Sequence, residues 1–185
     1  MLKCERVGIK IKLINMISFD YPGSIQIIND SIEASKRILA DDNFYLLIDQ
    51  KKKFDYSNCD ASQVGETIKS SSLVLTVKTY KHPWGLSLGK EFSSDPTSVY
   101  INVAHEKLVG RTIPSIVNTL IHELVHAADS DNDSFVFNHG NDNSPKGKGD
   151  SAPYWIGCLA EMLLEKQGTV ITVNSVDEQS QNDCG

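Results

Sequence analysis

The chain has 185 residues, of which 40% are hydrophobic and 23% are charged, and this composition suits a single globular domain with a sizeable core. The formal net charge of −6 argues against general nucleic-acid binding, which usually requires a basic face. No stretch of the sequence approaches the roughly 20 apolar residues that a membrane-spanning helix needs.

The first part of the chain is predicted to contain two strands and one helix. Alternating apolar residues predict a strand over residues 7–19. Ser24 is placed to cap a helix that runs to about residue 40. A short strand is expected over 44–49, and the lysine triplet 51–53 is expected to form a solvated turn. The polar residues 55–71 are expected to form a loop with at most one helical turn.

Two further strands, over 72–80 and 99–103, lead to the longest predicted helix, over 112–129. Apolar residues recur along this helix at the i, i+3, i+4, i+7 spacing that buries one stripe. Thr112 is a suitable N-cap, and Pro114 lies in the first turn, where its missing N–H costs little. The polar residues of the helix fall on the opposite face, so the core face and the polar face are separate.

This helix carries the sequence His122-Glu123-Leu124-Val125-His126, whose two histidines fall on its polar face. Histidines four residues apart lie one helical turn apart on the same face, and together they can hold one Zn²⁺ at about 2.0–2.1 Å. Glu123 is then placed to take a proton from a metal-bound water. The pattern therefore predicts a catalytic zinc site; the alternative is two polar surface histidines on an amphipathic helix.

The remaining chain is predicted to complete a single domain. A loop over 130–153 is long for so small a protein, and loops of this length are usually functional or disordered. A helix is expected from about 152 to 166, followed by a short strand over 169–173. We assign residues 1–173 to one domain and expect the polar residues 174–185 to be a disordered tail.

A catalytic zinc ion needs a third protein ligand and an open position for water. Our first choice is His139, which lies thirteen residues after His126 in a loop that can turn back at Gly140. Asp129, one turn beyond His126, is an alternative ligand, or a residue that orients an imidazole by a hydrogen bond. Glu161, on the following helix, is the third candidate ligand.

The cysteines show no metal-binding or disulfide-framework spacing, and we expect free thiols, with Cys158 in the core. All four are widely scattered: Cys4, Cys59, Cys158 and Cys184. Lys10 and Lys12 interrupt the apolar run that a signal peptide would need. We therefore expect a cytoplasmic protein, or one that is exported as an effector by a non-classical route.

By His122-Glu123-x-x-His126, the chain resembles the zincin superfamily of zinc metallopeptidases. Asp129 and Asn132 stand where metzincins carry Gly and His, so the layout is more similar to minimal zincins such as the SprT-like family. In that family a His-Gly pair after the motif helix supplies the third ligand, as His139-Gly140 would here. Compact H-E-x-x-H proteins of similar size also occur among bacterial effectors and phage-encoded proteins.

The resemblance implies an α+β fold: a small mixed sheet, a motif-bearing active-site helix and a following C-terminal helix. It also implies a zinc-dependent metallopeptidase with Glu123 as the general base. Tyr154 is a candidate donor to the developing oxyanion, the alternative being an aromatic residue of the core or of the helix start, and His82 and His105 are other possible donors.

We expect a monomer that acts on a protein or peptide substrate. In zincins an edge strand aligns the substrate, and here the strand over 72–80 or the one over 98–103 is expected to do so. Two alternative functions remain. The first is a zinc hydrolase of a non-peptide amide, such as a cell-wall cross-link. The second is a non-catalytic binding module stabilised by zinc.

Overall fold

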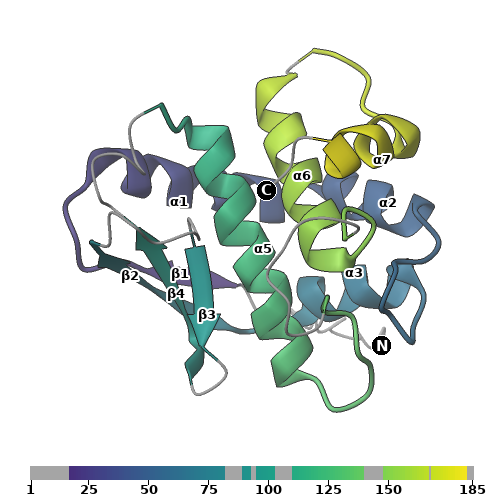
Figure 1. The fold of residues 1–185 in the computed structure, drawn as a ribbon, viewed down its shortest axis with the longest axis horizontal. Helices are drawn as coiled ribbons and strands as arrows, with labels where there is room; N and C mark the ends of the chain where they lie inside the picture. The colour runs from purple at the N-terminus through teal and green to yellow at the C-terminus, as the bar shows by residue number, and fades with distance from the viewer. Residues whose placement is uncertain are drawn as a thin grey trace, which may run out of the picture.

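A computed structural model of the chain places one helix, α5 (Ile113–Asp131), at the centre of the fold, as Figure 1 shows. On one side of α5 lie a small sheet and the helix α1 (Gln26–Leu39), and on the other side α6 (Ala152–Glu165) packs along it. The smaller helices lie on the same side of α5 as α6. The structure describes residues 17–81, 89–92, 95–102, 110–139, 148–166 and 168–182.

The sheet is mixed, as predicted. Its described strands follow the order β1 (Ser18–Asp20), β2 (Val74–Tyr80), β4 (Asp95–Asn102) and β3 (Gly89–Phe92). The pairs β1–β2 and β2–β4 are parallel, whereas β3 is antiparallel to β4. Parallel pairing needs a long connection, which the helices between β1 and β2 supply.

This strand order corrects one expectation. The strands predicted over 72–80 and 99–103 exist as β2 and β4, but both are inner strands with a neighbour on each side. Among the described strands the edges of the sheet are β1 and β3. β4 therefore has a neighbour on both of its backbone edges, whereas β2 is covered by β1 only at Val74–Thr76. Most of the strand predicted over 7–19 lies outside the described residues, and only its end is seen, in β1.

The three longest predicted helices are confirmed. α1 begins after Ile25, which forms no side-chain cap, so the cap expected at Ser24 is wrong. α5 begins as predicted, because the Thr112 hydroxyl accepts a hydrogen bond from the Ser115 N–H at 3.3 Å. α5 and α6 approach closely at Gly157, where a Cβ atom would lie 2.5 Å from Asn118 Oδ1. Any larger residue there would push the two helices apart.

The predicted strand over 44–49 is wrong, because these residues belong to α2 (Asp42–Gln50). This helix buries Phe44, Leu47 and Ile48, whose i, i+3, i+4 spacing is helical. A short apolar run fits a strand and a buried helix equally well until its neighbours are known. In the folded protein this segment packs as a helix against α3 (Ala61–Ser70).

The predicted loop over 55–71 is also wrong in its second half, where α3 (Ala61–Ser70) forms. Its start is stabilised by a capping box, in which Asp60 caps the backbone and the Gln63 side chain accepts a hydrogen bond from the Asp60 N–H at 3.0 Å. The polar composition of this stretch concealed a helix whose few apolar residues all point inward.

The strand predicted over 169–173 and the disordered tail predicted over 174–185 are wrong where the structure describes them. Helix α7 (Val173–Asn182) occupies this region and packs on α6. Its Val176 side chain is fully buried. Residues 174–182 therefore belong to the folded unit, beyond the boundary predicted at residue 173.

Lys51 holds α7 in place and is not part of a solvated turn. Its ammonium group bonds Asp150 at 2.8 Å and Asp177 at 2.6 Å, and its side chain is only 10% exposed. Asp177 also accepts a hydrogen bond from the indole of the fully buried Trp155 at 2.7 Å. Lys51 thus joins α2 to the start of α6 and to α7. Lys52 and Lys53 are exposed, as expected.

The cysteine prediction is confirmed at one position and corrected at another. Cys59 is a free, buried thiol. Cys158 lies in the core of α6, as expected, but it is disulfide-bonded and not free. Its partner lies outside the described residues. None of the described helices combines the length and the hydropathy needed to cross a membrane.

Candidate metal centre

Helix α5 presents His122 and His126 on one face, one turn apart. Their ring centroids are 5.0 Å apart, and both side chains are partly exposed. The opposite face of the helix is fully buried in the core, with residues such as Leu120 and Leu124. The separation of a core face from a polar face, predicted from the sequence, is what leaves both imidazoles free to point away from the core.

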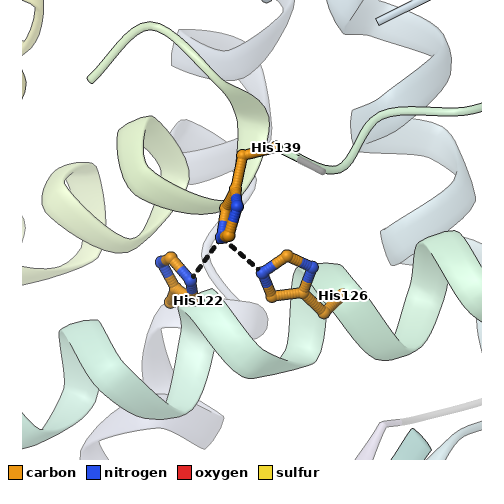
Figure 2. Close-up of side chains that lie close together, drawn as sticks. All are labelled: His122, His126 and His139. Atoms are coloured by element: carbon orange, nitrogen blue, oxygen red, sulfur yellow. Dashed lines mark hydrogen bonds between the residues drawn. The ribbon is translucent and has the colours of Figure 1, made fainter. Parts of the chain in front are cut away.

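The loop after α5 brings His139 to these two histidines, as Figure 2 shows. His139 Nε2 lies 2.9 Å from His126 Nε2 and 3.4 Å from His122 Nε2. One nitrogen from each ring lies within 4.8 Å of the other two. The three imidazoles thus converge on one point, although His139 is separated from the motif by a loop. His139 itself is almost fully buried.

This arrangement fits a metal ion. Nitrogens that hold a tetrahedral ion at about 2.0–2.1 Å lie about 3.3–3.4 Å from one another. The separations of His139 Nε2 from the other two rings, 2.9 and 3.4 Å, are close to that value. Three imidazoles suit several transition metals, including zinc, copper, iron and nickel. The geometry therefore establishes a cluster that can hold a metal ion, without selecting the element.

His122 and His126 are also in the protonation state that binds metals. Burial, followed by the nearness of His126 and His139, holds the pKa of His122 well below its usual 6.5. Burial is again the largest cause at His126, and with the nearby His139 and Lys148 it lowers the pKa to about 3. Both rings are therefore neutral at pH 7, so a metal ion does not have to displace protons from them.

The first turn of α6 brings the backbone of Pro153 close to His122, where it favours the charged ring against the larger effect of burial. Because proline has no N–H, the group that faces the ring is its carbonyl oxygen. Nε2 of His122 faces His139, which leaves Nδ1 for this carbonyl. A backbone carbonyl on the second nitrogen is the usual way in which a protein orients a metal-binding histidine.

The two alternative ligands are occupied elsewhere. Asp129 accepts hydrogen bonds from the Phe137 N–H and from Asn138 Nδ2, both at 2.6 Å. Glu161 accepts one from Asn118 Nδ2 at 2.6 Å. Neither carboxylate belongs to the histidine cluster. Of the three candidates for the third ligand, the structure brings only His139 to the motif.

The other predicted site residues lie close by or outside the described chain. Tyr154 packs its ring against His122, with 4.6 Å between centroids, and against His139, with 4.9 Å. It is 8% exposed, and Glu123, next to His122 in α5, is 6% exposed. The remaining two candidate donors, His82 and His105, lie outside the described residues.

Two contacts around the site were missed from the sequence. The Pro153 carbonyl contact involves the backbone, which leaves no side-chain signature. Asn58 pairs with Val136, which lies in the loop between the end of α5 and His139 (the ligand loop). The pair forms two hydrogen bonds, of 3.0 and 2.8 Å, although 78 residues separate them. Only a fold that places these segments side by side could reveal this pair.

Comparisons of the chain with protein-family models, with curated proteins and with solved structures gave no match. The function of the histidine cluster must therefore be argued from its own geometry and chemistry.

Proposed function

We propose that the protein is a zinc-dependent metallopeptidase that hydrolyses peptide bonds. The observation that carries this proposal is the convergence of His122, His126 and His139 beside a buried glutamate of the same helix. Three protein ligands leave a fourth position of a tetrahedral ion for water, which is the arrangement of catalytic zinc sites. Structural zinc sites are usually closed by four ligands and rich in cysteine.

We propose zinc as the metal because a zinc-bound water would supply the proton that Glu123 accepts. When bound, the ion acts as a Lewis acid and lowers the pKa of a coordinated water from 15.7 toward about 7. The three imidazoles would hold the ion, because their Nε2 atoms face one another. Glu123 follows His122 directly, and its burial keeps bulk water from competing for the proton that its carboxylate accepts. The same carboxyl group then delivers the proton to the leaving amine.

We propose that Tyr154 assists at the carbonyl oxygen. Its ring lies against two of the three imidazoles, so the phenol stays within the same small region as the reacting groups. A phenolic O–H can donate a hydrogen bond to the oxyanion that develops as the amide is attacked. The first turn of α6 therefore has two roles in the proposed site, through the Pro153 carbonyl and through Tyr154.

We assign substrate alignment to β3 in place of the two strands that we first considered. β3 is an edge strand of the described sheet and contacts α5, the helix that carries the histidines. An extended peptide can add to such an edge by backbone hydrogen bonds, which bind many sequences with little preference for side chains. The substrate class is then an extended protein segment or peptide.

Glu123→Gln tests the proposed chemistry. The amide is nearly the same size but cannot accept the proton, so we expect hydrolysis of a peptide library to fall about 10²–10⁴-fold while zinc content is unchanged. Glu178→Gln is the matched control, because it makes the same change at an exposed position on α7. Full activity of the Glu123 variant would exclude the proposed base.

The same assay separates the two alternative functions. Release of fragments from peptidoglycan, without cleavage of peptides, would indicate a zinc hydrolase of a cell-wall amide. Stable zinc binding by the wild-type protein without hydrolysis of either substrate would indicate a binding module.

Of the two locations considered, the disulfide at Cys158 favours export, because disulfides persist mainly in oxidising compartments. Thiol counting on denatured protein, purified without reductant, tests this. Detection of four free thiols per chain would argue against the disulfide, and the cytoplasm would then be the favoured location.

A further inference from the structure

The loop that carries His139 is tied back to α5 by one carboxylate. Both oxygens of Asp129 accept hydrogen bonds from this loop. Oδ1 accepts from the backbone N–H of Phe137, and Oδ2 accepts from the side-chain amide of Asn138, each at 2.6 Å. These donors belong to the two residues immediately before His139. The carboxylate therefore restrains the backbone next to the third metal-binding side chain.

The position of Asp129 couples the two parts of the cluster. It lies three residues after His126, on the helix that supplies the other two histidines. The fully buried ring of Phe137 anchors the same short segment in the core. A rigid helix on one side and a core anchor on the other leave the following residue, His139, with little freedom to move.

Helix stability does not explain a carboxylate at this position. Asp129 stands in the last turn of α5, where the helix dipole disfavours a negative charge, and no basic residue occupies that turn. The end of the helix is instead closed by Asn132, whose amide donates to backbone carbonyls such as that of Ala128. The two hydrogen bonds of the Asp129 carboxylate both come from the loop that carries His139.

We propose that Asp129 is a positioning residue, which acts through the Phe137–Asn138 segment to hold His139 Nε2 at the metal. This inference rests on the proposed zinc site. Its physical basis is preorganisation: a loop already ordered in the metal-free protein loses less conformational entropy when the ion binds. Residues that orient metal ligands in this way typically change metal affinity by about 10- to 100-fold when they are replaced.

Metal titration of the full chain tests the proposal. We expect Asp129→Ala to weaken zinc binding by about 10- to 100-fold, and to alter the visible absorption of the Co²⁺-loaded protein, which reports the ligands and their geometry. Asp131→Ala is the matched control: it removes the same charge from the same end of α5, at an exposed side chain. We expect it to bind both ions as the wild type does.

A pair of variants distinguishes positioning from general loss of structure. In Asp129→Asn, the amide oxygen can still accept from Phe137, but the bond to Asn138 can form only if the Asn138 amide turns over to present its Oδ1, and both bonds lose the negative charge of the acceptor, so zinc affinity should fall. In the double variant Asp129→Asn, Asn138→Asp, the donor and acceptor are exchanged and the bond can form again. We expect this exchange to restore most of the affinity and the Co²⁺ spectrum.

These outcomes also separate this inference from the proposed function. Unchanged affinity and spectrum in Asp129→Ala, while His139→Ala binds zinc weakly, would overturn the role of Asp129 and leave the zinc site intact. If Asp129→Ala does not fold, the two Asn variants decide, and failure of the exchanged pair to recover affinity overturns the proposal. None of these measurements depends on hydrolysis, so an inactive enzyme would not affect the result.

Discussion

At the residue scale, the site is defined by imidazoles that are kept neutral. Burial is the largest cause of the lowered pKa at both His122 and His126, and the neighbouring imidazoles add to it. A buried charge is expensive, so the folded protein favours the neutral rings that a metal ion requires. Because protonation of these rings is unfavourable in the folded protein, the stability of the metal-free protein should depend on pH.

The metal-free protein should lose stability in acid because of His126. Its pKa is near 6.5 in the unfolded chain and about 3 in the folded protein, so between these values the unfolded state binds the extra proton. The free energy of unfolding should therefore be unaffected above pH 6.5 and should fall as the pH drops toward 3. Urea unfolding in a chelator, at several pH values, measures this. His126→Asn should show a shallower decline; parallel curves would contradict the assignment.

Replacement of Tyr154 by Phe should affect the chemical step more than binding. The ring and its packing against His122 and His139 are kept, while the hydrogen-bond donor is lost. Loss of one oxyanion donor typically costs about 10²–10³ in kcat, and we expect little change in KM or in zinc content. Tyr45→Phe is a suitable control, because that hydroxyl bonds the Leu39 carbonyl, away from the cluster. An unchanged kcat would remove Tyr154 from the mechanism.

At the scale of elements, the site depends on how α6 is held against α5. The first turn of α6 contributes the Pro153 carbonyl and Tyr154. Directly before that turn, Asp150 bonds Lys51, and the buried Trp155 bonds Asp177 of α7. Helices α2 and α7 therefore form the support for α6, although neither contributes a side chain to the cluster.

Lys51→Met should destabilise this support. The substitution keeps most of the apolar stem but leaves Asp150 and Asp177 without their shared cation. Removal of one partner from a buried ion pair costs about 3–5 kcal/mol, and we expect the lower end because both carboxylates are about one-third exposed. Chemical denaturation measures the change. Lys53→Met, at an exposed position in the same turn, should be nearly neutral; equal losses in both variants would contradict the role of Lys51.

At the scale of the whole molecule, the cluster joins two parts of the chain. His122 and His126 belong to the central helix, while His139 belongs to the loop between α5 and α6. A bound ion would cross-link these parts in the folded state only. Binding that is confined to the folded state must raise its stability by mass action.

Zinc should therefore raise the melting temperature, and a chelator should reverse the effect. At a free zinc concentration of 100 times Kd the expected gain is about 2.7 kcal/mol, or about 5–10 °C for a protein of this size. His139→Ala should lose most of this shift. Thermal unfolding followed by circular dichroism makes the measurement, and an equal shift in wild type and variant would mean that zinc binds elsewhere.

The features that could be predicted from the sequence are local ones. The H-E-x-x-H spacing, the Thr112 cap and the apolar stripe of α5 all depend on residues within a few turns of one another. The helical repeat is constant, so residues four apart lie on one face whatever the rest of the fold does. α6 was predicted for the same reason, from the regular spacing of its apolar residues.

Secondary structure was predicted wrongly in segments whose pattern of apolar residues was short or sparse. The apolar run at Phe44 was too short to distinguish a strand from a helix, and α3 and α7 carry too few apolar residues to show a clear period. These three helices form because neighbouring elements cover their buried faces. Lys51 is a similar case, since a lysine becomes a buried ion-pair partner only when two carboxylates from distant segments meet it.

The sequence by itself therefore determined the pair His122 and His126, with Glu123 between them, because helical geometry sets their relative positions. It left the third ligand among His139, Asp129 and Glu161, since spacing along a loop does not determine the path of the loop. Tertiary contacts decided that point: Asp129 binds the loop and so brings His139 to the cluster, while Glu161 pairs with Asn118.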